Sequence, residues 1–284
     1  MSIIDKCDKI GERILEEKGI NTLPVDVKKL AEDSDFIVAP FPKGQSGNGY
    51  AGMLLRQGND FAIFYSETIK NDGFQRFTIA HELGHYFIDG HLGAVLDASG
   101  VHKSREPFSS GDQFEKQADS FAAGLLMPTG LCRRITRQYD DSLEAILALA
   151  TACNTSLMSS AIRYAEMSEG KIAIIVSENG QVLFSCVSRP MAFSGFFVRS
   201  KASLPQTSLS ARCGVDSDFI ASARSGEQEG DLSDWGSHKS CLCLEQVKGL
   251  GATGKILTVL IPQTEEGEDE DEDTEVGGFD LRFR

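Results

Sequence analysis

The stretch Phe77–His91, FTIAHELGHYFIDGH, decides how the first half of this chain folds. It contains an H-E-x-x-H motif, in which His81 and His85 are four positions apart and Glu82 follows the first histidine. On an α-helix, positions i and i+4 lie on one face, so both imidazoles can point at one metal ion. The apolar residues around the motif predict a buried helix over about 72–88. Buried histidines and a carboxylate need polar partners, which a metal ion would supply.

Glu82 lies beside the metal-facing histidine but remains free to act on a water molecule. Zinc lowers the pKa of a bound water to about 7. Glu82 would then take a proton as general base and pass it to a leaving amine. An H-E-x-x-H pentapeptide also occurs by chance on ordinary helices, but the apolar flanks of this one favour a metal site.

Two residues are candidates for the third metal ligand. His91 follows His81 by ten positions, as in the extended three-histidine zinc motif, but the glycine of that motif is replaced by Ile88. Glu115 lies on a second expected helix, about 113–126. Asp119 follows it by four positions, so the two carboxylates share one face of that helix. Asp119 is expected to orient a metal-bound histidine. We favour Glu115 and keep His91 as the alternative.

The residue that would stabilise a developing oxyanion is open. His91, Tyr86 and Tyr65 are candidates, either for that role or for contact with a substrate. An extended substrate could pair with an edge of the sheet that contains the expected strand 60–66.

Two longer stretches resemble one known family. Residues 76–91, RFTIAHELGHYFIDGH, and residues 114–128, FEKQADSFAAGLLMP, are similar to the two helices of the ImmA/IrrE family of metallopeptidases. Residues 23–32, LPVDVKKLAE, are similar to the opening of that family. The resemblance covers about residues 20–165 and is vaguer afterwards.

The resemblance implies an α+β fold with a zincin-like peptidase domain, and a zinc endopeptidase of the gluzincin type. One zinc ion per chain would bind His81, His85 and Glu115, with Glu82 catalytic. The substrate would be a helix-turn-helix transcriptional repressor, and its cleavage would relieve repression in a stress response or in a mobile element.

The pattern along the chain predicts four parts: a zinc metallopeptidase domain (1–135), a helix-turn-helix-like helical extension (136–168), a small β-containing sensory or interaction domain (170–264) and an acidic disordered tail (265–284). In the first part, two strands flank the turn QGND, and residues 89–111 are expected to form a loop. In the third part, Asn179-Gly180 predicts a hairpin turn, whereas residues 202–218 and 222–234 are turn-rich.

Charge limits the partners that we expect. The formal net charge is −14, and residues 265–275 alone carry nine carboxylates, so the remainder has a net charge of −5. An acidic surface repels the phosphate backbone, and the second helix of the extension has a single basic residue, Arg163. Direct DNA binding is therefore not expected, although a DNA-binding regulator stays a minor alternative.

The remaining features favour a protein of the cytoplasm. The chain shows no signal peptide and no apolar run of membrane-spanning length, and its seven cysteines suit free thiols in a reducing compartment. The main alternative to an enzyme is a non-catalytic, zinc-containing regulatory binding partner of the antitoxin kind.

Overall fold

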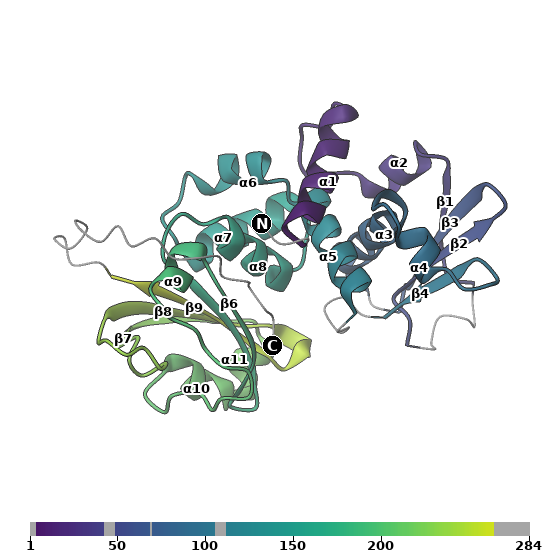
Figure 1. Ribbon diagram of the computed structural model, residues 1–284. Coiled ribbons are helices and arrows are strands. Elements are labelled where there is room, and N and C mark those ends of the chain that lie inside the picture. The colour runs from purple at the N-terminus through teal and green to yellow at the C-terminus, as the bar shows by residue number, and fades with distance from the viewer. Residues whose placement is uncertain (1–3, 43–48, 69, 106–111, 264–284) are drawn as a thin grey trace. The chain divides into compact units, whose positions relative to one another are not determined.

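The computed structural model describes residues 4–42, 49–68, 70–105 and 112–263 (Figure 1). The chain divides into two compact units: unit 1 is Met1–Ile135 with Ala148–Ser159, and unit 2 is Thr136–Leu147 with Ser160–Arg284. The strands form two separate sheets, and helices alternate with them along the chain, which confirms the expected α+β class. The expected acidic tail lies outside the described residues.

Unit 1 contains a four-stranded sheet with the strand order β1-β3-β2-β4. β1 (Phe36–Pro40) is parallel to β3 (Asp60–Tyr65), and β2 (Gly52–Gln57) is antiparallel to both β3 and β4 (Val101–Ser104). β2 and β3 form the hairpin that the QGND turn predicts. Within the described residues, β1 and β4 are the edges and β3 is interior, so an added peptide strand would have to pair with β1 or β4.

Two capped helices carry the residues of the expected metal site. The Asn71 side chain accepts a hydrogen bond from the Phe74 N–H at the start of α3 (Asp72–Phe87). Asp112 accepts hydrogen bonds from the Phe114 and Glu115 N–H groups at the start of α5 (Gln113–Leu126). The other helices of unit 1 are α1 (Ile4–Glu17), α2 (Val27–Glu32), α4 (His91–Val95) and α6 (Thr129–Thr136).

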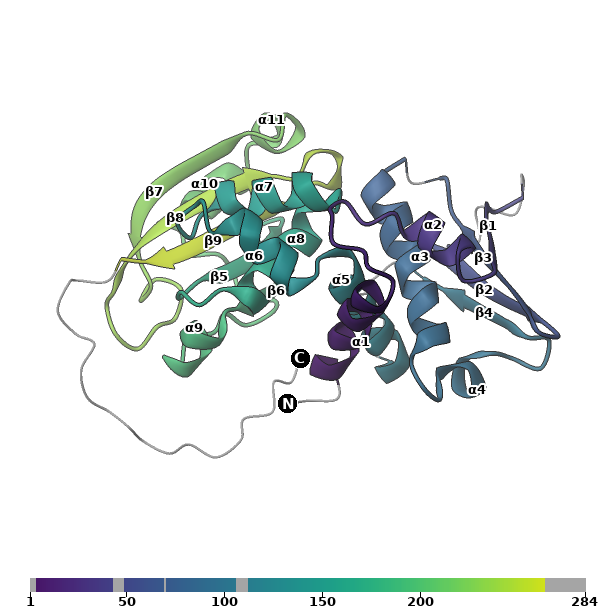
Figure 2. The ribbon, with the colours of Figure 1, turned by 90° about the horizontal axis from the view of Figure 1, so that it is seen from above.

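Glycines let these helices pack closely, and α5 lies between α1 and α3 (Figure 2). A Cβ atom at Gly84 of α3 would be 3.1 Å from the Cα of Ala118 in α5. A Cβ atom at Gly124 of α5 would overlap the carbonyl group of Asp8 in α1. Gly84 thus brings the backbone of α3 close enough to α5 for their polar side chains to meet, and Gly124 does the same for the backbones of α5 and α1.

Residues 89–111 are not the plain loop that the sequence predicts. They contain α4 and the short strand β4, although 106–111 lie outside the described residues. β4 has four residues and forms through pairing with β2, far away along the chain, with Leu54 opposite His102 and Gly52 opposite Ser104. Such a non-local pairing leaves little trace in the local sequence.

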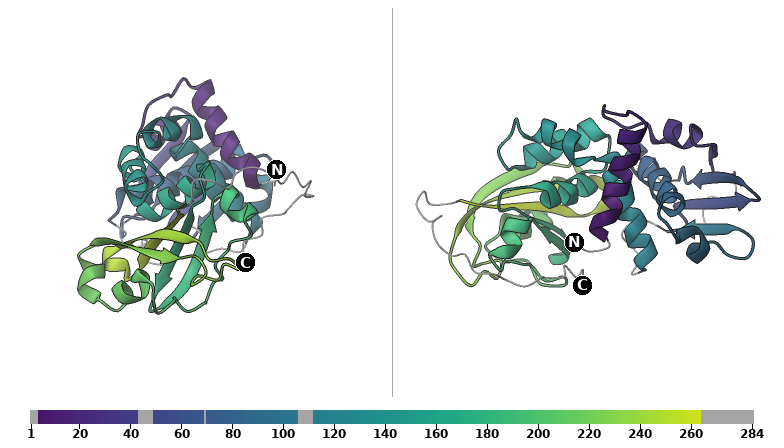
Figure 3. Two further views of the ribbon diagram at one scale, coloured as in Figure 1. Left: turned by 90° about the vertical axis from the view of Figure 1, so that its left-hand side faces the viewer. Right: turned by 45° about the horizontal axis from the view of Figure 1, so that its top comes forward.

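The sheet of unit 2 is drawn in green and yellow in Figure 3. It has five antiparallel strands in the order β6-β5-β9-β8-β7. The φ angles of Asn179 and Gly180, 52° and 76°, confirm the expected hairpin turn between β5 and β6. The turn-rich residues 222–234 include a strand, β7, that the sequence pattern did not reveal. The strands are β5 (Ala173–Glu178), β6 (Gln181–Val187), β7 (Ser225–Asp231), β8 (Leu242–Gly249) and β9 (Ile256–Pro262).

Short helices complete unit 2. They are α9 (Arg189–Phe193), α10 (Leu209–Gly214) and α11 (Ser217–Ala221). Glu245 of β8 is buried, and it accepts hydrogen bonds of 2.9 Å from the backbone N–H groups of Leu209 and Ser210. This buried carboxylate therefore fastens the start of α10 to the sheet.

The two expected helices of the extension are α7 (Leu143–Cys153) and α8 (Leu157–Met167), and each is divided between the units. Among the described residues, no single helix has the length and apolar character of a membrane span. α7 and α8 meet the length and composition criteria only when taken together, and they are bent by 115° at the break between them.

Replacing Gly124 by alanine is expected to destabilise unit 1 by about 1–3 kcal/mol, because the new methyl group would force α1 away from α5. Urea unfolding followed by circular dichroism measures the change. Gly130→Ala is the matched control: Gly130 is exposed on α6, with no atom within 4 Å of its Cβ position. Equal effects of the two substitutions would contradict this packing.

Candidate metal centre

Helix α3 places His81, Glu82 and His85 in the interior of unit 1. Residues 77–85 of α3 are all buried, since α5 packs on the helix and β2 and β3 contact it too. The Nε2 atoms of His81 and His85 are 3.1 Å apart, one turn from each other on the same face. The motif therefore brings two imidazole nitrogens to one point, as its spacing predicts.

Helix α5 brings two carboxylates to these histidines. Glu115 Oε2 lies 3.2 Å from His81 Nε2, and Glu115 Oε1 lies 3.4 Å from His85 Nε2. Asp119, one turn later, has its Oδ1 atom 2.8 Å from His81 Nδ1, on the other side of the ring. Asp119 thus fixes the orientation of the His81 ring while Glu115 faces the shared point.

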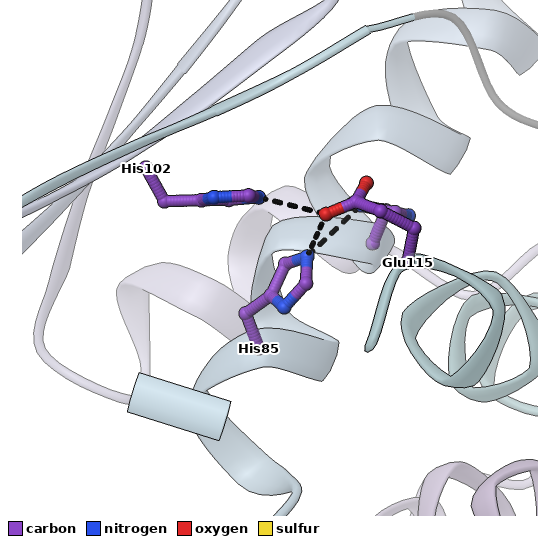
Figure 4. Close-up of side chains that lie close together, drawn as sticks. His85, His102 and Glu115 are labelled. Carbon is purple, nitrogen blue, oxygen red and sulfur yellow. Dashed lines mark hydrogen bonds and ion pairs between the residues drawn. The ribbon is translucent and has the colours of Figure 1, made fainter. Parts of the chain in front are cut away.

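A third histidine, His102, completes the group, and the sequence pattern did not single it out. It projects from β4, and its Nε2 atom lies 3.1 Å from Glu115 Oε1. The rings of His85 and His102 have centroids 4.4 Å apart. Figure 4 shows His102 approaching Glu115 from the strand while His85 approaches from a helix.

The four side chains fit a metal ion. Donor atoms of His81, His85, His102 and Glu115 all lie within 4.8 Å of one another. Ligands at zinc–nitrogen and zinc–oxygen distances around a tetrahedral ion would be about 3.3–3.5 Å apart. The four separations of 3.1–3.4 Å among His81, His85, His102 and Glu115 that the structure shows are close to that spacing. This group could therefore hold a metal ion.

His91 is buried and contacts His85 on the side of the ring that faces away from Glu115. Its Nδ1 atom is 3.2 Å from His85 Nδ1, and its Nε2 atom is 2.8 Å from Gln117 Oε1. Because His85 directs its Nε2 atom at Glu115, His91 contacts the ring nitrogen that faces away from that group. This placement suits a residue that orients His85.

The two candidate tyrosines lie elsewhere. The Tyr86 ring packs edge-on against Phe36 and Phe61, with centroids 4.8 and 4.9 Å away. Tyr65 ends β3, opposite Gly52 in the sheet. Neither tyrosine makes a hydrogen bond or ion pair with the four clustered side chains within the described part of the chain.

The two carboxylate oxygens of Glu82 differ in their hydrogen bonding. Its side chain is fully buried, and its Oε1 atom accepts a 2.6 Å hydrogen bond from the Ser104 hydroxyl. Its Oε2 atom has no hydrogen-bond partner among the described residues. A Cβ atom at Gly52 would be 2.5 Å from Glu82 Oε1, so the glycine makes room for this carboxylate. A buried oxygen without a partner indicates a place for a polar molecule.

Electrostatics favour a cation between the helices. Burial would lower the pKa of His81, but hydrogen bonds to Asp119 and Glu115 raise it to about 10. Burial lowers the pKa of His85 to about 3, which leaves its imidazole neutral and able to donate a lone pair. Burial raises the pKa of Glu82, and the charges of His81 and His102 offset this only in part.

The pKa of Glu115 changes in the opposite direction. Burial alone would raise it, but hydrogen bonds to His102, His81 and His85 lower it well below its usual range. Glu115 is therefore an anion that faces three imidazoles, which is the charge state that a metal ligand requires.

Replacing Asp119 by asparagine is expected to weaken metal binding about 10–100-fold, because His81 loses the carboxylate that orients its ring. Competition with a chromophoric chelator measures the affinity. Asp60→Asn, at an exposed position of β3 in the same unit, is the control and should bind as the wild type does. An unchanged affinity in Asp119→Asn would show that Asp119 does not act through His81.

Comparisons with known proteins concern first the fold. A Mycobacterium tuberculosis transcriptional regulator of known structure has a similar fold, with a TM-score of 0.56 over 90% of this chain and 88% of that chain. The sequences are 15% identical, so this likeness concerns the fold alone. No curated protein matches the chain.

The family comparison covers the metal centre itself. The model of the IrrE N-terminal-like domain, a peptidase family, matches residues 53–164. The matched segment contains the four clustered side chains together with Glu82 and Asp119, and it confirms the resemblance noted in the sequence. Residues 53–164 of this chain are therefore similar to an IrrE N-terminal-like domain.

Proposed function

We propose that this chain is a zinc-dependent endopeptidase in which His81, His85 and Glu115 hold the metal and Glu82 is the general base. The observation that carries the proposal is the burial of Glu82, next in sequence to His81, with an Oε2 atom that has no hydrogen-bond partner among the described residues. A bound zinc ion would lower the pKa of a water molecule to about 7 and polarise the scissile carbonyl group.

The residues around Glu82 support this role. His81 and His85 would hold the metal from one side of the helix, and Glu82, next in sequence to His81, lies on the same buried segment. Its free oxygen can accept a proton from water and deliver it to the leaving amine. Gly52 leaves room for the carboxylate, so the orientation of Glu82 depends on the backbone of β2.

A helix-turn-helix repressor is the substrate that we propose. The proposal is supported by the family match, by the resemblance to the ImmA/IrrE metallopeptidases and by the absence of features for direct DNA reading in α8. Arg163, the basic residue of α8, is buried and lies 3.4 Å from Glu166, so its charge is not offered to phosphate. An extended segment of the substrate could pair with the outer edge of β4.

We further propose that unit 2 serves as a sensory or interaction domain. The proposed compartment of the protein is the cytoplasm. Its sheet and short helices form a hydrophobic core of their own, which includes Ile175, Trp235 and Leu260. This core supports a separately packed unit that could receive a signal or a partner.

Replacing Glu82 by glutamine is expected to abolish cleavage while keeping the metal, because the amide has the same shape but cannot accept the proton. The measurement is a mass-spectrometric comparison of new protein N-termini in cells that express the wild type or Glu82→Gln. We expect the wild type alone to generate a new N-terminus within a helix-turn-helix repressor.

The same comparison tests the non-catalytic alternative, a zinc-containing regulatory binding partner. If Glu82→Gln relieves repression as well as the wild type does, and no new N-termini depend on Glu82, then cleavage is not the function. Metal content, measured on both purified proteins, ensures that a loss of cleavage does not come from a loss of zinc.

A further inference from the structure

Strand β4 contributes two side chains to the metal centre. His102 and Ser104 are two positions apart, so they project from the same face of the strand. His102 Nε2 lies 3.1 Å from Glu115 Oε1, and Ser104 Oγ lies 2.6 Å from Glu82 Oε1. One short strand therefore contacts both the metal-ligand group and the general base.

His102 is a fourth donor in a group where a catalytic metal site would need only three protein ligands. Catalytic zinc sites have three protein ligands and leave the fourth position to water, whereas structural sites are closed by four protein ligands. His102 Nε2 is 3.1 Å from Glu115 Oε1. The donor atoms of His81, His85 and Glu115 are 3.1–3.4 Å from one another, so His102 is as close to Glu115 as the other histidines are. Four protein donors around one ion would leave no place for water.

Ser104 contacts Glu82, the proposed general base. Its hydroxyl is buried and donates to Glu82 Oε1, and the backbone at Gly52 closes in on the same oxygen. Ser104 Oγ also lies 3.1 Å from His102 Nε2, so the two side chains of β4 are joined. A movement of β4 would therefore release the fourth position and the Glu82 oxygen together.

The place of β4 in the sheet allows such a movement. Within the described residues, β4 pairs with β2 alone, through four residue pairs, whereas β2 and β3 each pair on both sides. An edge strand with one short ladder is held by fewer hydrogen bonds than an interior strand. His102 can thus leave the donor group without disruption of α3 or α5.

We propose that His102 is a fourth, displaceable protein ligand that closes the metal site of the resting chain. The inference rests on the proposed function, because it assigns a regulation to the same site. β4 then determines whether the site is closed, with His102 on the metal and Ser104 on Glu82, or open to water and substrate. The alternative role for His102 is that of a hydrogen-bond donor to Glu115 alone.

X-ray absorption spectroscopy of the zinc-loaded full chain tests this proposal by counting imidazole ligands. We expect three imidazoles in the wild type and two in His102→Ala. Metal affinity, measured by chelator competition, should fall about tenfold or more in the variant, since a ligand is lost. His238→Ala, which removes an exposed histidine of unit 2, is the control and should change neither quantity.

A second measurement reports on the open position without any substrate. Acetohydroxamic acid binds metal ions at an open site, and its affinity for the cobalt-substituted protein can be followed by visible absorption. We expect it to bind His102→Ala about tenfold or more tightly than the wild type, because no imidazole has to be displaced. Free imidazole should weaken that binding in the variant. His102→Gln provides the same test if His102→Ala does not fold.

The failures of the two proposals are distinguishable. Two imidazoles in both the wild type and His102→Ala, with equal affinities for metal and hydroxamate, would overturn the role of His102 and leave the proposed peptidase intact. A wild-type protein that binds no metal would overturn both. Three imidazoles in the wild type and two in the variant, with tighter hydroxamate binding, would establish the closed site.

Discussion

Burial of His81, Glu82 and His85 on one helix is the constraint on which unit 1 depends. Removing a charged or polar group from water costs several kcal/mol unless a partner replaces the water. Helix α3 is buried all round at these positions, so the surrounding elements have to supply partners. Glu115 and Asp119 do this for His81, while His91 contacts His85 and Ser104 contacts Glu82.

The packing of unit 1 follows from that need. Glycines at positions 52 and 84 remove side-chain volume where β2 and α3 meet their neighbours, so donor atoms from different elements come within about 3 Å. The Asp112 cap fixes the first turn of α5, which carries Glu115. Glu82 Oε2, which has no hydrogen-bond partner among the described residues, is the atom that a general base would present to water.

The parts of the site with local sequence signals could be predicted. α3 and α5 lie where the H-E-x-x-H motif and the expected ranges 72–88 and 113–126 place them, and in unit 2 the Asn179-Gly180 turn forms as expected. His102 could not be predicted because it is a single histidine in a polar segment. It reaches the site only through the pairing of β4 with β2, and four residues carry too little pattern to reveal such a strand. The strand β7 was missed for a related reason, since its residues are mostly polar and glycine-rich.

The metal content of the untagged chain, measured by mass spectrometry after dialysis against a weak chelator, tests the central claim most directly. Wild-type protein should retain about one zinc ion per chain. Glu115→Ala should lose most of it, because the carboxylate that faces three imidazoles is gone, whereas His91→Ala should retain it. No metal in the wild type, or equal metal in the wild type and Glu115→Ala, would contradict the account.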